Sequence, residues 1–329
     1  MISRQGGLRA SDKLGRLLEW FLLTPEHRCV DPGAPIAVIL FPHSEPISME
    51  AKKQKDKGKQ AGKSDDRSSP FFVLGCVRSG TTMLRDVLRL HPNLVAPEET
   101  HFFRWAEPFG TEGYMRGALN NPVLKKHRAL DGVTEEEFAV MLKAAHSRAD
   151  LYTRYMKVFM ERRKPTATRW FDKTPQNVYG ASMIALSVPR SRFVHIVRDP
   201  VNVVSSLRIG KIVKVERLTA AINYWREATD TMSVMKRAYP ARVHEFRYED
   251  FVRDMPTHIR ALLSFLGEPY DAKWFEGFRL AESDHSSEGV LTDEEIARVN
   301  QLTLHGRRRY GYATPEELAL SESAESAVS

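Results

Sequence analysis

Two glycines and a run of hydrogen-bond donors lie between an apolar segment and an amphipathic one, in the stretch FFVLGCVRSGTTMLRDVLRLHP from Phe71 to Pro92. Gly75 and Gly80 have the spacing of the phosphate-binding pattern G-x-x-x-x-G-K-[ST], but Thr81 occupies the lysine position. That lysine serves the β- and γ-phosphates of a nucleoside triphosphate, together with magnesium. A loop without it favours a ligand with one phosphate at this position over ATP or GTP, and we expect no metal.

The loop keeps the other parts of an anion site. Gly75 and Gly80 permit the tight turn, and the N–H groups at the start of the following helix face an anion. Ser79, Thr81 and Thr82 add hydroxyl donors, and the guanidinium of Arg78 suits a phosphate or a sulfonate. The alternative is a glycine-rich turn that merely joins a strand to a helix, but four donor side chains exceed what such a turn requires.

Strands and helices alternate around this loop. The apolar run from Phe71 to Gly75 predicts a strand buried on both faces, and Gly80 to Leu90 predicts an amphipathic helix. Asp199 can cap a helix that begins at Pro200. Further strands are expected at 168–172, within 192–200 and at 242–248, and further helices within 100–165, at 215–238 and at 256–266. This alternation predicts an α/β fold, a P-loop-like parallel sheet with helices on both faces and a mostly helical insert after the first strand–helix unit.

Four stretches together resemble the sulfotransferases that use 3′-phosphoadenosine 5′-phosphosulfate (PAPS). VRSGTTMLRDVLRLHPNLVAPEET looks like the 5′-phosphosulfate loop of that family, and FVHIVRDPVNVVSSLRIGK looks like its 3′-phosphate segment. WFDKTPQN resembles its lysine-proline loop, and FRYEDFVRDMPTHIRALLSFLG resembles its strand and helix around a Tyr-Glu-Asp triplet. The resemblance runs from Phe71 to Tyr312 and is greatest to the branch that includes bacterial sulfotransferases and tyrosylprotein sulfotransferases.

The resemblance implies a donor with a second phosphate on its ribose 3′ oxygen, which needs an anion site of its own. Arg198 and Ser206 are the candidates, because Arg198 closes an apolar strand at the sheet edge where ligands bind in open α/β folds. Tyr248 either contacts the nucleotide or packs in the core. The arginines at 307–309 either reach the 3′ phosphate or form a solvated helix end, which we favour, and His195 is expected to be a core residue.

Sulfonate transfer requires that the acceptor lose a proton, and APEETHFF offers Glu98, Glu99 and His101 for this task. The resemblance to the tyrosylprotein branch assigns the base to Glu99. His101 is the second candidate, because many small-molecule sulfotransferases use a histidine at about this point of the chain. A partly buried glutamate with a raised pKa would suit the role. The alternative is a solvated acidic loop.

The leaving phosphate oxygen needs a positive charge, and Lys173 is the candidate. It precedes Thr174 and Pro175, so the backbone there is expected to be extended and fixed. In the enzymes that this chain resembles, the lysine of this motif contacts the bridging oxygen, and Arg78 would share the charge. The alternative is an ordinary surface lysine.

Composition limits the class of protein. The chain has 329 residues, a net charge of +7, 42% hydrophobic and 28% charged residues, as in a soluble globular protein. It has no basic stretch interleaved with aromatic residues and no zinc-ligand spacing, so we expect no nucleic acid partner. Cys29 and Cys76 form no disulfide framework. No apolar run approaches the ~18 residues of a membrane span and no signal peptide is evident, so we expect a cytoplasmic protein.

The chain divides into three parts. Residues 1–69 are expected to be a disordered or loosely attached extension, because 49–69 is rich in lysine and nearly free of apolar residues. Met49 is a candidate translation start, with residues 1–48 then outside the domain. Residues 70–314 form the predicted sulfotransferase domain, and 315–329 form a polar C-terminal tail.

The favoured function is transfer of a sulfonate from PAPS to a hydroxyl or amine, with release of 3′,5′-ADP. A P-loop kinase or NTPase is a first alternative, disfavoured by the missing lysine and the lack of a persuasive Walker B strand. A non-catalytic nucleotide-binding protein is a second, disfavoured by the presence of both Glu99 and Lys173. The acceptor, whether small molecule, glycan or peptide, and the oligomeric state are not specified by these residues, although 102–165 is expected to build the acceptor pocket.

Overall fold

A computed structural model describes residues 69–319 of the chain, apart from 211–212 and 280–288. The expected N-terminal extension therefore lies almost wholly outside the described residues, and so does most of the expected C-terminal tail.

A five-stranded parallel sheet forms the centre of the fold, with the strand order β2-β3-β1-β4-β5. In its register, Phe71 lies opposite Phe171 on one side and Arg192 on the other. Because all the strands are parallel, their carboxyl ends lie at the same edge of the sheet. The strands are β1 (Phe71–Leu74), β2 (Leu94–Val95), β3 (Arg169–Lys173), β4 (Arg192–Val197) and β5 (Val243–Arg247).

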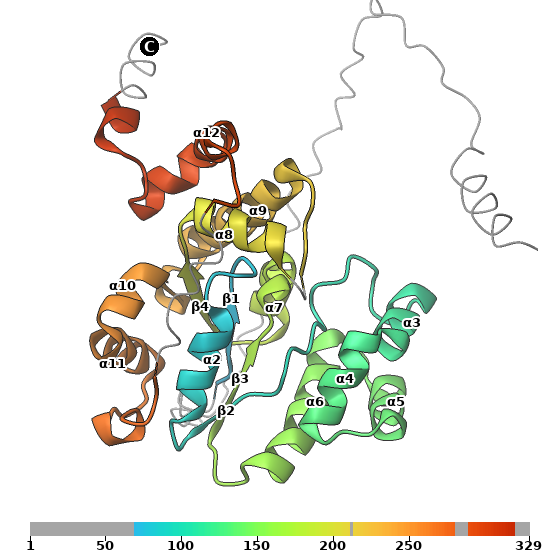
Figure 1. The fold of residues 1–329 in the computed structure, drawn as a ribbon. Helices are drawn as coiled ribbons and strands as arrows, with labels where there is room; N and C mark the ends of the chain where they lie inside the picture. Colours follow the sequence, from blue (N-terminus) through green and yellow to red (C-terminus); the bar gives the residue numbers. More distant parts are fainter. Residues whose placement is uncertain (1–68, 211–212, 280–288, 320–329) are drawn as a thin grey trace, which may run out of the picture. The chain divides into compact units, whose positions relative to one another are not determined.

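Helices connect the strands and cover the sheet (Figure 1). Those around the sheet are α2 (Thr81–Arg89), α7 (Ala181–Ser187), α8 (Pro200–Ile209), α9 (Leu218–Ala238), α10 (Tyr248–Arg253), α11 (Met255–Leu266) and α12 (Asp293–Tyr310). A second group lies between β2 and β3 and is gathered together in Figure 1: α3 (Glu112–Asn120), α4 (Pro122–Asp131), α5 (Glu135–Ala144) and α6 (Arg148–Arg163). The described residues also form the short 3-10 helices η3 (Pro175–Gly180), η4 (Pro240–Arg242) and η5 (Ala272–Trp274).

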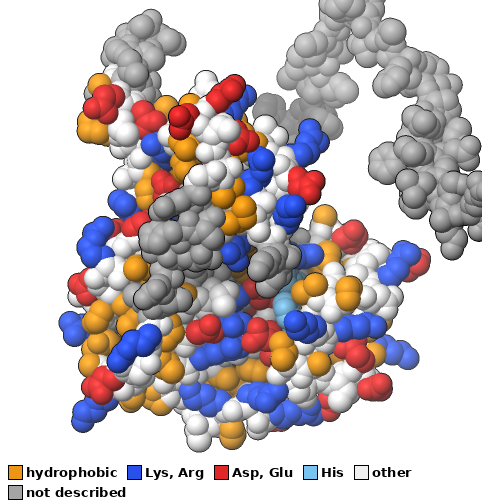
Figure 2. All heavy atoms as spheres, in the orientation of Figure 1, with side chains coloured by type: hydrophobic (Ala, Val, Ile, Leu, Met, Phe, Trp, Pro, Cys, Tyr) orange, Lys and Arg blue, Asp and Glu red, His pale blue; other side chains and the backbone are white. Residues whose placement is uncertain are grey.

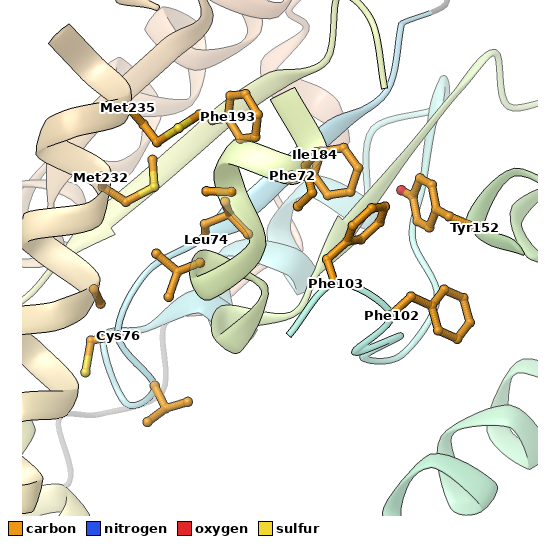
Figure 3. Close-up of a cluster of buried hydrophobic side chains, with 14 of the residues drawn as sticks. Phe72, Leu74, Cys76, Phe102, Phe103, Tyr152, Ile184, Phe193, Met232 and Met235 are labelled. Atoms are coloured by element: carbon orange, nitrogen blue, oxygen red, sulfur yellow. The ribbon is translucent and has the colours of Figure 1, made fainter. Parts of the chain in front are cut away.

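Successive side chains of β1 point to opposite faces of the sheet, and their neighbours show which helices cover each face. Phe72 and Leu74 pack in one buried cluster with side chains of α6, α7, α8 and α9, and Phe71 and Val73 pack in another with α2, α10 and α11. Figure 3 shows part of the first cluster, in which Met235 of α9 lies beside Phe193. The central strand is buried on both faces, which explains why its sequence is continuously apolar.

The α/β fold expected from the sequence is confirmed. The four expected strands and the helices expected at 80–90, 215–238 and 256–266 are present within a few residues, and Asp199 caps α8 by accepting a hydrogen bond from the Asn202 N–H at 3.0 Å. His195 is a buried residue, as expected.

Several described elements were not predicted, among them β2, α7 and all of α12 except its end at 307–309. β2 has only two residues, too few for a periodic pattern. α12 begins with a capping box of Thr292 and Glu295, a signal that is readable in the sequence.

The expectation that the arginines at 307–309 form a solvated helix end is wrong for Arg307, which is buried and pairs with Glu317 at 2.5 Å.

The turn between β1 and α2 depends on a close approach at Gly80. Gly80 has a left-handed backbone (φ 88°), and a Cβ atom there would lie 2.5 Å from Cδ2 of Tyr248. A side chain at this position therefore meets both backbone strain and a rigid ring.

We predict that Gly80→Ala lowers the free energy of unfolding by more than about 1–2 kcal/mol, the cost of a left-handed non-glycine residue alone. Gly117→Ala is the matched control, because Gly117 lies within α3 and its Cβ would meet nothing within 4 Å. The control should be neutral or stabilising by roughly 0.5–1 kcal/mol. Chemical denaturation of both variants checks this, and equal effects would contradict the role given to Gly80.

Candidate active site

A cavity of about 400 Å³ opens at the carboxyl edge of the sheet. The predicted site residues Arg78, Thr81, Thr82, Glu99, His101 and Lys173 all line it. They come from the loop after β1, the segment after β2 and the end of β3, so the parallel sheet brings three distant parts of the sequence to one place.

The loop after β1 is held in an uncommon conformation. Arg78 has a positive φ of 72°, which is rare for a residue other than glycine and is often found at functional sites. Ser79 is buried, and its hydroxyl has no hydrogen-bond partner in the described part of the chain. A buried hydroxyl of this kind calls for an explanation, and a ligand oxygen would supply one.

Arg78, Arg198, Ser206 and Tyr248 are brought together beside this loop. The Arg78 Nε donates to Ser206 Oγ at 2.8 Å, and the Arg198 Nη1 donates to the Arg78 carbonyl at 3.3 Å. The Arg198 guanidinium lies 4.6 Å from the centre of the Tyr248 ring. Arg198 from the end of β4, Ser206 from α8 and Tyr248 from α10 thus surround Arg78 of the loop. The two guanidinium groups and the serine hydroxyl are a suitable setting for a second anionic group.

Lys173 supplies the ammonium that the loop itself lacks. It is 1% exposed at the end of β3, its Nζ donates to Thr82 Oγ1 at 3.1 Å, and it forms an ion pair with Glu99. Burial lowers the pKa of Lys173, although the charge of Glu99 opposes this effect. It is therefore not a surface lysine.

Glu99 lies between two donors. Lys173 Nζ contacts its Oε1, and the His101 Nε2 lies 3.3 Å from its Oε2. Burial alone would raise the pKa of the Glu99 carboxyl, but the hydrogen bond from His101 and the charge and hydrogen bond of Lys173 outweigh it and lower the pKa to about 2. The sequence suggested a base with a raised pKa, whereas this arrangement favours the carboxylate.

A buried carboxylate, Asp172, connects the segment of Glu99 to that of Lys173. Thr100 Oγ1 donates to its Oδ2 at 2.5 Å, Thr174 Oγ1 donates to its Oδ1 at 2.7 Å, and the Thr100 N–H donates to Thr174 Oγ1 at 2.9 Å. Burial raises the pKa of Asp172 to about 6, against the hydrogen bonds from both threonines. These contacts fix the backbone on either side of Glu99 relative to Lys173.

The helical insert also holds this segment. In α4, His127 Nδ1 donates to the Glu99 carbonyl at 3.0 Å, and Asp131 Oδ1 accepts from the Glu98 N–H at 2.8 Å. The Glu98 carboxylate itself accepts from Arg85 Nη1 at 2.6 Å, so it has a different set of partners from Glu99.

Several contacts within the site were not predicted from the sequence. Asp172 and Thr174 lie within the quoted WFDKTPQN stretch, so their position was a usable signal. His127 and Asp131 had no sequence signal of this kind, because they lie in an ordinary amphipathic helix and come to the site only when the chain folds. Arg104, which lies 3.2 Å from His101, was also missed.

Within the residues that the structure describes, there is no group of three or more His, Cys, Asp and Glu side chains placed to hold a metal ion. None of the described helices is both long and apolar enough to cross a membrane. Figure 2 shows basic and acidic side chains intermixed over one face.

Comparison with curated proteins finds distant relatives. The chain is 24% identical over 315 residues to an omega-hydroxy-beta-dihydromenaquinone-9 sulfotransferase of Mycobacterium bovis, with 76% of this chain and 78% of the relative covered. It is 22% identical over 242 residues to a putative protein-tyrosine sulfotransferase of Caenorhabditis briggsae, with 69% and 74% covered.

Solved structures share the fold. The sulfotransferase domain from the olefin synthase of Synechococcus PCC 7002 superposes with a TM-score of 0.56 at 20% identity, covering 75% of this chain and 96% of that domain. The sulfotransferase domain from the curacin biosynthetic pathway gives a TM-score of 0.50 at 19% identity, covering 75% and 99%. The profile of the sulfotransferase family matches residues 70–272, which is more than half of the sequence. The chain therefore belongs to the sulfotransferase family.

Proposed function

We propose that the protein transfers a sulfonate group from PAPS to a hydroxyl or amine of a small-molecule acceptor and releases 3′,5′-ADP. The proposal rests on three groups that line one cavity. They are the loop at 78–82, which suits an anion, the buried ammonium of Lys173 and the carboxylate of Glu99.

The loop after β1 suits the 5′ phosphosulfate of the donor. The first turn of α2 begins at this loop, where helical N–H groups favour an anion, and Thr81 and Thr82 of that turn line the cavity. The unpartnered Ser79 hydroxyl supports this assignment, because an oxygen of the donor would satisfy it.

Arg198 and Ser206 suit the second phosphate of the donor. Both adjoin Arg78 but neither lines the cavity around Glu99, so a ligand with two separate anionic groups fits the arrangement better than one with a single chain of phosphates. A guanidinium has five N–H donors, and the described contacts of Arg198 use one of them on the Arg78 carbonyl.

The proposed reaction breaks the bond between the sulfonate sulfur and the bridging oxygen of the donor, and forms a bond between that sulfur and the acceptor oxygen or nitrogen. The acceptor proton goes to Glu99, and the negative charge that develops on the leaving phosphate is stabilised by Lys173 and Arg78. Loop, lysine and carboxylate already face one another, so the protein contributes mainly by positioning and charge neutralisation.

The ion pair between Lys173 and Glu99 implies that the donor binds before Glu99 accepts a proton. While Lys173 is paired with Glu99, the pKa of Glu99 is about 2 and the carboxylate is a weak base. A donor in the loop brings new negative charge beside Lys173, which competes with Glu99 for the ammonium. The pKa of Glu99 then rises and the carboxylate becomes a better proton acceptor.

A small-molecule acceptor is proposed on two grounds. One curated relative is named for a menaquinone derivative, and the outer wall of the cavity includes the apolar side chains Val123 and Leu124 of α4, together with Val213. Incubating pools of candidate hydroxyl and amine compounds with PAPS and scoring the mass gain of one sulfonate tests the function and identifies the acceptor.

We predict that Arg198→Ala weakens binding of 3′,5′-ADP by about tenfold or more, the consequence of losing a charged hydrogen bond worth roughly 1.5–3 kcal/mol. Binding of AMP, which lacks the 3′ phosphate, should be nearly unchanged. Arg208→Ala is the matched control on the neighbouring helix, where Arg208 pairs with Glu295. Titration calorimetry without magnesium checks this. An equal loss for the two nucleotides would move Arg198 away from the 3′ phosphate.

We predict that Glu99→Gln lowers turnover by about 10² to 10⁴ while donor affinity stays near that of the wild type. Glutamine keeps the size and shape of the side chain but does not accept a proton at neutral pH. Glu98→Gln is the matched control and should cost far less, because Glu98 is paired with Arg85. Steady-state assays with the identified acceptor check this, and near-normal turnover of Glu99→Gln would remove it as the base.

A further inference from the structure

The neighbours of His101 assign a role to each nitrogen of its ring. Arg104 Nη1 lies 3.2 Å from Nδ1, and Glu99 Oε2 lies 3.3 Å from Nε2. A guanidinium only donates hydrogen bonds and a carboxylate only accepts them. The Nδ1 atom must therefore carry a lone pair and the Nε2 atom must carry the proton, so both contacts are satisfied by one neutral tautomer.

We propose that Arg104 is a positioning residue for the sulfonate transfer, which fixes His101 in the Nε2–H tautomer so that His101 donates to Glu99 and does not itself take the acceptor proton. This inference rests on the proposed function, because it concerns the proton acceptor of that reaction. The sequence left open whether Glu99 or His101 is the base. In this inference Glu99 is the base and His101 is the group that orients it.

The ring of His101 is held firmly in this position. His101 is 3% exposed, its backbone has a positive φ of 57°, and its ring stacks 5.9 Å from that of His127. A strained backbone of this kind persists only where the surroundings determine it. Neither ring nitrogen is left to accept a proton from a substrate, because Nδ1 faces Arg104 and Nε2 bears a hydrogen.

Arg104 is held in turn by an aromatic neighbour. Its guanidinium lies 4.2 Å from the centre of the Trp105 ring, and Arg104 lines the cavity. The charged and titratable groups that face His101 are Glu99, Arg104 and His127. Arg104 and His127 disfavour an imidazolium, as burial does, and only Glu99 favours one, so the pKa of His101 is lowered and the ring is neutral at pH 7.

The arrangement identifies the oxygen that takes the proton. Oε2 of Glu99 lies 3.3 Å from Nε2 of His101, whereas Oε1 contacts Lys173. If the donor draws Lys173 away, Oε1 loses its partner while Oε2 keeps one. The carboxylate then stays in place and presents Oε1 to the acceptor, which is the purpose that an orienting hydrogen bond serves.

A first experiment reads the tautomer without any turnover. The full chain is labelled with ¹⁵N-histidine, and the ring nitrogens of His101 are assigned by comparison with His101→Asn. The wild type should show the Nε2–H pattern at pH 7, and Arg104→Met should shift His101 toward the Nδ1–H form. Arg116→Met, an exposed arginine of α3, is the matched control and should change nothing. An Nδ1–H tautomer or an imidazolium in the wild type would overturn the proposal.

A second experiment separates orientation from proton transfer. His101→Gln places an amide N–H near the position of Nε2, whereas His101→Asn places one near Nδ1, and neither side chain is a base. We expect turnover within about tenfold of wild type for glutamine and a loss of about 10- to 100-fold for asparagine, with little change in donor affinity. Backbone strain does not explain that order, because asparagine tolerates a positive φ better than glutamine.

The outcomes distinguish this inference from the function on which it rests. If both His101 variants lose turnover by more than 100-fold while Glu99→Gln retains it, His101 is the base and the inference is wrong. If the wild type moves no sulfonate from PAPS to any acceptor but shows the Nε2–H signal, the proposed function is wrong and the tautomer assignment is supported.

Discussion

The ion pair between Lys173 and Glu99 is the interaction on which the rest of the site depends. Lys173 is almost fully buried, and an ammonium removed from water is costly unless an opposite charge and further hydrogen bonds compensate. Glu99 and Thr82 provide that compensation in the free protein. In the proposed reaction a bound donor would also supply negative charge to Lys173, so the ammonium would exchange Glu99 for the donor without losing its compensation.

Much of the surrounding structure serves to keep these two charges at the sheet edge. Asp172 joins the two segments through threonine hydroxyls, and α4 holds the Glu99 segment through His127 and Asp131. The helical insert therefore has a second function beyond forming the outer wall of the cavity. A change of acceptor specificity by substitutions on α4 would have to leave these two contacts intact.

The sequence was sufficient for the fold and for the residues that sit beside strand ends. Continuous apolar runs marked β1 and β4, and the glycines and arginines that follow them marked Arg78 and Arg198. It was not sufficient for Arg104 and His127, whose contacts with His101 and Glu99 are encoded by no local pattern. The lowered pKa of Glu99 was likewise unreadable, because it depends on the partners that folding brings to it.

The protonation of Glu99 with and without donor nucleotide tests the central claim most directly. A ¹³C-carboxyl titration of glutamate-labelled protein, with Glu99→Gln used for assignment, reports its pKa in the free protein and in complexes with PAPS and with 3′,5′-ADP. We expect a pKa of about 2 for Glu99 in the free protein and a clear increase with PAPS, because the donor takes Lys173 from the carboxylate. A pKa that does not change when PAPS binds would show that Lys173 stays with Glu99, and would contradict the account.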